Sequence, residues 1–216
     1  MSLRVGIVAY QGVLADESGA FRDVLRRIPG SIVLTVGAGP GIVAGPGGIQ
    51  RVDVTFDDVR TADVVVVPGG LGSHRHPEII DWLDRVHPEW ILTSSTGSAL
   101  LAASGLLRGR TAATHWLAGP LLERHGVTVS DDRLVVDEPF VTAAGVTSAY
   151  DASFVVVRRV GGPALVARIR AEMADDRDPG VCTRPVVARR RPARRSARAI
   201  DVAGSVEVEL EVTRRR

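Results

Sequence analysis

Short apolar runs that alternate with amphipathic stretches are the feature that most restricts the fold of this chain. The run Ala62–Pro68 (ADVVVVP) contains four consecutive valines, as expected of a strand buried on both faces of a sheet. The runs Leu3–Tyr10 and Ser31–Val36 are also predicted strands, and helical spacing of apolar residues predicts helices over 16–28 and 78–87. Strands that alternate with helices form βαβ units. The sequence therefore predicts an α/β fold with a mostly parallel sheet and helices on both faces.

The same alternation continues through the second half of the chain. A strand that includes 91–94 is predicted to lead into the helix Ser98–Leu107, and further elements follow it. The predicted strands are 111–114, 127–129, 134–136 and 140–143, and the predicted helices are 116–124, 147–160 and 163–173. In the first half, Val52–Phe56 is a further short strand, whereas the Gly/Pro-rich segment Gly37–Gly48 is predicted to be a loop. That loop lacks the Gly-Lys-Ser/Thr of a phosphate-binding loop.

One strand-to-helix turn has the composition of a nucleophile elbow. The apolar run at 91–92 ends in Thr93-Ser-Ser-Thr96, followed by Gly97 and the compact helix. At such an elbow the residue at the bend adopts a sparsely allowed backbone conformation, and its side chain lies over the first N–H groups of the helix. Those N–H groups favour an anion or a developing oxyanion. Ser95 occupies the bend by position; the alternative is an ordinary βα turn, because hydroxyl residues and glycine commonly start helices.

Charge divides the chain into a main body and a tail. Residues 1–185 contain 18 arginines and 21 acidic residues, a net charge of −3, whereas residues 186–216 contain 9 arginines and 4 acidic residues, a net charge of +5. We therefore expect one domain over 1–175 and a basic C-terminal tail over 176–216. The alternating run Val206–Val212 in that tail is typical of a half-exposed strand that can join a sheet edge.

Several classes of protein do not fit this composition. No apolar run reaches the length of a membrane span, and the N-terminal residues lack the layout of a signal peptide. The single cysteine, Cys182, excludes an internal disulfide. The mildly acidic body does not favour nucleic-acid binding, and an arginine run without aromatic residues is more typical of a solvated linker. We expect a soluble, cytoplasmic protein without contact to a membrane.

Five segments, in this order along the chain, resemble the ThiJ/PfpI superfamily. They are VVVVPGG (64–70), SSTG (94–97), ASGLLRG (103–109), AATHW (112–116) and TAAG (142–145). The resemblance covers about residues 3–175 and is strongest to the branch that holds isonitrile hydratases and the amidotransferase-like domains of AraC-type regulators. It implies a flavodoxin-like sandwich of the class I glutamine amidotransferase kind.

The resemblance also implies the candidate catalytic residues. In the family the elbow carries a cysteine, a carboxylic acid from the loop after the first strand hydrogen-bonds to it, and in several members a histidine lies near. By motif these positions are Ser95, Glu17 and His115 in this sequence. The serine is the main departure, since a hydroxyl needs a general base whereas a thiol is partly ionised near neutral pH. His115 is the candidate base and Glu17 the candidate orienting group.

Other roles are open for two of these residues. His115 can be a packing histidine beside Trp116, and Glu17 can be a first-turn acid that interacts favourably with the helix dipole. Gly69, Gly70 and Thr96 are the candidate ligand-binding or oxyanion residues, with the backbone of Gly70 and Thr96 as the expected donors. No metal site and no cofactor are expected.

Two functions follow from this set of residues. The first is a hydratase-like or hydrolase-like enzyme, isonitrile hydratase among the candidates, that acts through Ser95. The second is a catalytically silent domain that binds or senses a small molecule, related to the domains of AraC-type regulators. In both cases the expected partner is a small-molecule substrate or ligand, and the resemblance implies a homodimer.

Overall fold

The computed structural model describes residues 2–176 of the 216-residue chain. The predicted tail from residue 177 on, with its arginine run and the segment Val206–Val212, lies outside the described residues, as does Cys182. Within the described part, strands and helices alternate as the sequence predicted.

A seven-stranded sheet forms the middle layer of the domain. Five strands, β1 (Arg4–Ala9), β2 (Ile32–Gly37), β5 (Val54–Thr55), β6 (Val64–Val67) and β7 (Trp90–Ser94), are joined by β10 (Leu134–Asp137) and β11 (Phe140–Ala143) in the order β10-β11-β7-β6-β1-β2-β5. All neighbouring pairs are parallel except β10–β11. The mostly parallel sheet is therefore confirmed, and the carboxyl ends of β1, β6 and β7 meet at one edge of it.

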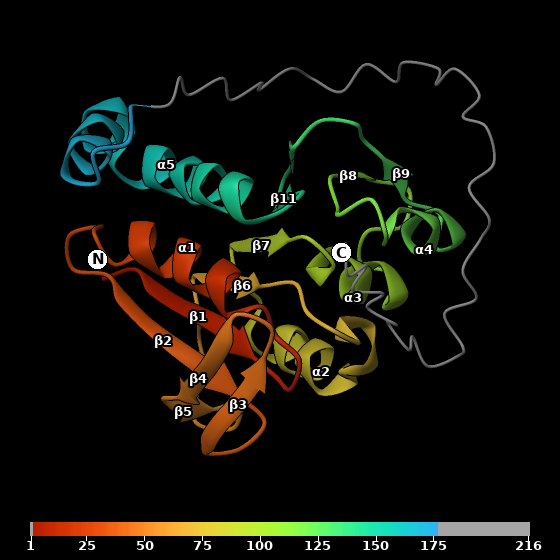
Figure 1. The fold of residues 1–216 in the computed structure, drawn as a ribbon. Helices are drawn as coiled ribbons and strands as arrows, with labels where there is room; N and C mark the ends of the chain where they lie inside the picture. The colour runs from red at the N-terminus through yellow and green to blue at the C-terminus, as the bar shows by residue number, and fades with distance from the viewer. Residues whose placement is uncertain (1, 177–216) are drawn as a thin grey trace, which may run out of the picture. The chain divides into compact units, whose positions relative to one another are not determined.

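Helices cover both faces of this sheet, as Figure 1 shows. On one face, α1 (Ala15–Leu25) packs beside α5 (Val146–Glu172), and their buried apolar residues form a core with the inward side chains of β1, β6 and β7. On the other face, α2 (Pro77–Val86), α3 (Gly97–Ala103) and α4 (Gly119–Arg124) enclose a second core around Trp82. Because both faces are covered, all four valines of β6 are fully buried, which explains their continuous apolar run.

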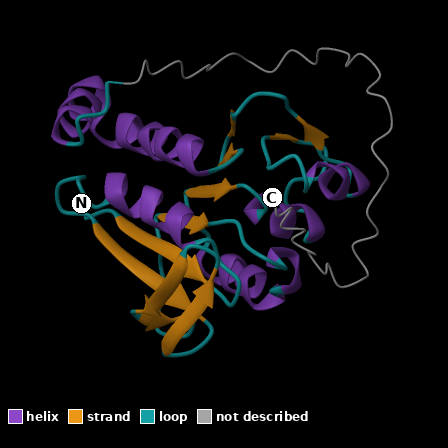
Figure 2. Ribbon diagram, in the orientation of Figure 1, coloured by secondary structure: helices purple, strands orange, loops and turns teal. Residues whose placement is uncertain are grey.

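The segment predicted as a loop over 37–48 is the main correction to the predicted fold. It contains β3 (Gly41–Gly45), which pairs antiparallel with β4 (Gly48–Val52) in a separate hairpin (Figure 2). Glycine and proline normally favour turns, but tertiary contacts stabilise these strands. The hairpin is held to the loop after β1, since the Gly12 N–H donates to the Ala44 carbonyl at 2.8 Å.

Several helix boundaries also differ from the prediction. Helix α3 ends at Ala103, before Gly105 with its positive φ of 85°, and α4 begins only at Gly119. The two helices predicted on either side of Pro163 are confirmed as two helical segments of α5, which meet where Gly162 has non-helical backbone angles. Two short strands, β8 (Thr111–Ala112) and β9 (Thr128–Val129), pair in parallel next to α4. Within residues 2–176, no helix has the length and apolar character needed to cross a membrane.

Candidate active site

The strand-to-helix elbow predicted at Ser95 is present. Ser95 follows the last residue of β7 and has a φ of 50°, in the left-handed region that residues other than glycine rarely occupy. Its backbone is held from both sides. The Ser95 N–H donates to the Ala143 carbonyl of β11 at 2.9 Å, and the Ser95 carbonyl accepts hydrogen bonds from the hydroxyls of Thr114 (2.8 Å) and Ser98 (3.2 Å). These bonds stabilise a backbone conformation that is otherwise unfavourable.

Two glycines allow the chain to pack closely around the elbow. A Cβ at Gly97 would lie 2.2 Å from the Val67 carbonyl oxygen, so only glycine fits between α3 and the end of β6. A Cβ at Gly69 would lie 2.8 Å from the Cβ of Ser95 and 2.9 Å from Glu17 Oε2. The glycine at position 69 therefore brings the loop after β6, the elbow and the acid together.

Glu17 reaches this place from the first turn of α1. The loop before that helix is fastened to the loop after β6, since the Leu14 N–H donates to the Gly69 carbonyl at 2.8 Å and Val13 forms an antiparallel bridge with Gly70. As a result Glu17 lies under the elbow, with only 2% of its surface exposed. Its Oε2 accepts hydrogen bonds from the Ser94 hydroxyl at 2.5 Å and from the Gly69 N–H at 2.7 Å.

Burial raises the pKa of Glu17 above its ordinary value, because a carboxylate loses its hydration there. Hydrogen bonds from Ser94, from the Gly69 N–H and from Ser95 act in the opposite direction, as does the charge of His115. Desolvation outweighs them, so the net change is upward. A buried carboxyl with a raised pKa beside a candidate nucleophile is the arrangement expected of an acid–base group.

We expect Glu17→Gln to stabilise the protein at neutral pH. A raised pKa means that folded Glu17 binds its proton more tightly than unfolded Glu17, so its favourable contribution is present at low pH and is lost as the pH rises above about 4.5. Glutamine is neutral throughout and keeps an acceptor for Ser94 and Gly69. The variant should melt higher than the natural protein at pH 7–8, by about 2–4 °C for each kcal/mol in a domain of this size. The difference should shrink towards pH 4. A variant that melts lower at every pH would contradict this origin of the shift.

His115 lies beside the elbow but does not complete a linear relay. Its backbone N–H points to the Ser95 carbonyl at 3.4 Å, and its Nδ1 accepts a weak hydrogen bond from the Leu117 N–H, also at 3.4 Å. Among residues 2–176 the His115 ring forms no hydrogen bond with Ser95 or with Glu17. The acid contacts the elbow serines directly, whereas a serine–histidine–acid triad places the histidine between them.

The three predicted ligand-binding residues surround the same point. The Gly69 N–H donates to Glu17, and the Thr96 hydroxyl bridges Gly70 by accepting from its N–H and donating to its carbonyl, both at 2.9 Å. A ligand oxygen that uses the Gly70 N–H would have to share or replace that bond. The Thr96 N–H forms no hydrogen bond to another residue in the described part of the chain. It is therefore a donor that is available at this place.

Three residues that matter here were not singled out from the sequence. Ser94 holds the Glu17 carboxyl, Thr114 donates to the Ser95 carbonyl, and the Ser98 hydroxyl lies 3.2 Å from that carbonyl and 2.8 Å from the Thr114 hydroxyl, either of which can accept its proton. All three lie inside or next to the recognised SSTG and AATHW segments. Their hydroxyl side chains at buried positions were the signal, since a buried hydroxyl needs a partner.

The chain is similar to a known protein family and to proteins of known activity. The sequence model of the DJ-1/PfpI family matches residues 4–159. Isonitrile hydratase from Pseudomonas putida is 31% identical over 169 residues, which make up 75% of this chain and 74% of that protein. The HTH-type transcriptional regulator CdhR from Pseudomonas aeruginosa is 27% identical over 143 residues, or 63% of this chain and 42% of the regulator. The chain thus spans less than half of that regulator.

The fold agrees with these sequence relationships. The crystal structure of a ThiJ/PfpI family protein from Pseudomonas syringae matches this structure with a TM-score of 0.77 at 22% sequence identity, over 83% of this chain and 78% of that one. The match therefore supports the α/β architecture, and the sequence comparisons supply the relationship. Since the family match spans most of the chain, this protein belongs to the DJ-1/PfpI family.

Proposed function

We propose that this protein is a hydratase-like or hydrolase-like enzyme that uses Ser95 as its nucleophile on a small organic substrate. The observation that carries the proposal is the strained elbow at Ser95 directly above the buried Glu17 carboxyl. The identity to an isonitrile hydratase supports the same reaction class. That reaction adds one water to an isonitrile and yields an N-substituted formamide.

In this proposal Glu17 is the proton acceptor for Ser95. Hydrogen bonding of the Ser95 side chain is among the interactions that act on the pKa of Glu17, whereas the His115 ring forms no bond to that hydroxyl within the described residues. With an ester as substrate, the Ser95 oxygen bonds to the carbonyl carbon and its proton passes to the Glu17 carboxylate. The carbonyl electron pair moves to the oxygen, where the Thr96 N–H can donate to it. Protonated Glu17 then returns its proton to the leaving alkoxide, and water releases the acyl group.

In this scheme His115 is not the general base that the sequence predicted. Its ring lies close enough to Glu17 for its charge to lower the pKa of the carboxyl. A positive charge there favours the carboxylate, which is the form that accepts a proton. We therefore assign His115 to positioning and electrostatics, and Glu17 to proton transfer.

A catalytically silent binding or sensor domain is the second candidate. Two observations favour it: a serine stands at the elbow in place of the family's usual cysteine, and CdhR, a transcriptional regulator, is a relative. The two functions are separated by incubating the purified chain with an activated ester and with an alkyl isonitrile. Turnover that is lost in Ser95→Ala supports the enzyme. Ligand-induced stabilisation without turnover, equal in both proteins, supports the binding domain.

We further propose that the protein is a homodimer. The outer face of the β3–β4 hairpin exposes Ile42 and Ile49, with 62% and 69% of their surfaces accessible. Exposed apolar side chains that are grouped on one element are typical of protein contact surfaces. Light scattering should report twice the chain mass of 22.9 kDa, and Ile42→Glu combined with Ile49→Glu should reduce it to one chain mass. A single chain mass for the natural protein across a wide concentration range would exclude the dimer.

A further inference from the structure

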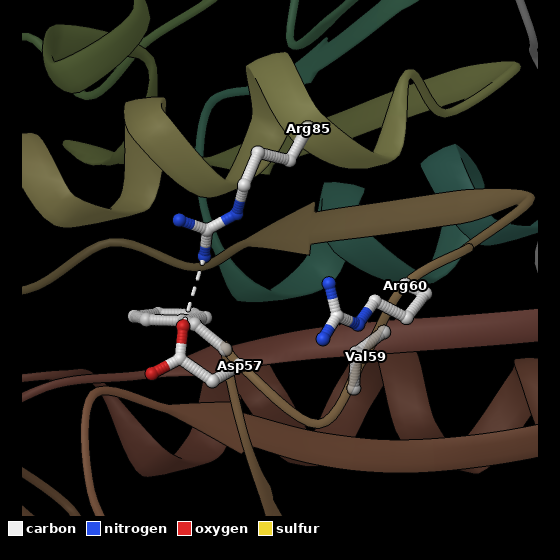
Figure 3. Close-up of a pocket in the computed structure, with 5 residues that line it drawn as sticks. Asp57, Val59, Arg60 and Arg85 are labelled. Atoms are coloured by element: carbon white, nitrogen blue, oxygen red, sulfur yellow. Dashed lines mark hydrogen bonds and ion pairs between the residues drawn. The ribbon is translucent and has the colours of Figure 1, made fainter.

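A cavity of about 290 Å³ lies away from the elbow, on the face of the sheet that α2 covers. It opens between the segment that joins β5 to β6 and the last turn of α2 (Figure 3). Its lining consists of Phe56, Asp57, Val59, Arg60 and Arg85. None of these residues belongs to the candidate active site, so the cavity needs an explanation of its own.

The wall formed by the β5–β6 segment is held in shape by several interactions. Phe56 is buried and its ring lies 5.1 Å from that of Trp82, measured between centroids. The Trp82 indole N–H donates to the Val59 carbonyl at 3.2 Å. The Asp58 carboxylate accepts hydrogen bonds from the N–H and the hydroxyl of Thr55, at 2.9 and 2.6 Å. The cavity is therefore largely formed before any ligand binds.

The charges that line the cavity are unbalanced. Two guanidinium groups, those of Arg60 and Arg85, extend into the space between the two walls in Figure 3, against the single carboxylate of Asp57. Arg60 has neither a hydrogen bond nor an ion pair with any residue of the described part. Among residues 2–176 the Arg85 guanidinium pairs with Asp57 alone, at 3.5 Å, and the Asp57 side chain is 92% exposed. An ion pair this open to water contributes little, so both arginines can turn to a ligand.

We propose that this cavity binds a small organic oxyanion, with a phosphate or carboxylate group between Arg60 and Arg85. Guanidinium groups bind both oxyanions through paired N–H···O hydrogen bonds, and two of them can contact one group from opposite walls. The apolar surfaces of Phe56 and Val59 suit a compact organic portion next to the charge. The volume is near the lower end of small-molecule sites, which limits the ligand to a small one.

The test is a titration of the full chain at constant ionic strength, monitored by NMR of its backbone amides. The probes are inorganic phosphate, phenyl phosphate and benzoate, with chloride as the reference salt. We expect saturable chemical-shift changes in the amides of residues 56–60 and 82–85. Whichever of phenyl phosphate and benzoate binds more tightly identifies the charged group that the cavity prefers. Arg60→Gln and Arg85→Gln should each weaken binding at least tenfold, and Asp57→Asn should strengthen it severalfold because a repelling carboxylate is removed.

Arg51→Gln is the matched control, because Arg51 is an exposed arginine of β4 that does not line the cavity. It should leave the affinity unchanged. The proposal is overturned if no probe causes saturable shifts, or if Arg51→Gln weakens binding as much as the two cavity variants. All four substitutions are at exposed positions, and equal melting temperatures would show that each variant is folded.

Discussion

The thiol of a Ser95→Cys variant is expected to react with iodoacetamide at least about ten times faster than Cys182 of the same chain. The elbow would place the new sulfur beside the Thr96 N–H, a hydrogen-bond donor that stabilises the thiolate, and beside the Glu17 carboxylate, which can accept the thiol proton. A hydrogen-bond donor beside a cysteine lowers the pKa of its thiol, so a larger share of it is ionised near neutral pH. Peptide mass spectrometry after short exposures measures both cysteines in one sample.

The matched control is Ser104→Cys, which places an exposed thiol just after the last residue of α3. That end of the helix carries carbonyl groups and disfavours a thiolate, so this cysteine should react no faster than a free thiol. Access to iodoacetamide favours the control thiol, because Ser95 is only 4% exposed whereas position 104 is open to water. If the buried thiol of Ser95→Cys still reacts faster, its environment and not its exposure is the cause.

The Ser95→Cys variant is also expected to gain isonitrile-hydrating activity that exceeds that of the natural protein.

In the natural protein, ester hydrolysis should fall at least 10²-fold in Glu17→Gln and by a smaller factor in His115→Ala. Removal of a group that transfers the proton in the transition state typically costs about 10²–10⁴ in rate. His115 acts through its charge on Glu17 and lacks a hydrogen bond to the Ser95 hydroxyl in the described structure, so its loss costs less. The reverse order, with His115→Ala the more damaging variant, would show that the histidine is the base and that a relay forms when substrate binds.

The pH dependence of this activity supplies an independent measurement. Activity requires the Glu17 carboxylate, so its acid limb should report the raised pKa of that group. Ser94→Ala removes a hydrogen bond that lowers the pKa of Glu17, and the acid limb should therefore move to higher pH. Ser104→Ala, which lacks contact with the acid, should leave the limb in place. An unreactive thiol in Ser95→Cys, together with no ester hydrolysis by the natural protein, would leave the binding domain as the function.

Local patterns were sufficient for most of the architecture. Continuous valines in β6 and helical spacing in α2 are consequences of burial that repeat along the chain, so they can be read without knowledge of the partner elements. The elbow is equally local, because a strand end, small hydroxyl residues and Gly97 follow one another directly. The hairpin β3–β4 was missed for the opposite reason. Its glycines favour a loop, and only its antiparallel pairing and its contact with the loop after β1 make it two strands.

The chemistry of the site was decided by contacts between distant parts of the chain. Glu17 and His115 were identified through the family motifs, but periodicity says nothing about the order of the strands that brings them to one edge. The bond between Ser94 and Glu17 joins residues 77 positions apart, and the raised pKa of that acid depends on how completely the loop after β6 and the elbow exclude water from it. The sequence by itself thus determined the fold class and the position of the elbow. Tertiary packing decided that the acid contacts the serines directly and that the histidine lies beside them, because hydrogen bonding and desolvation depend on distances in space and not on separation along the chain.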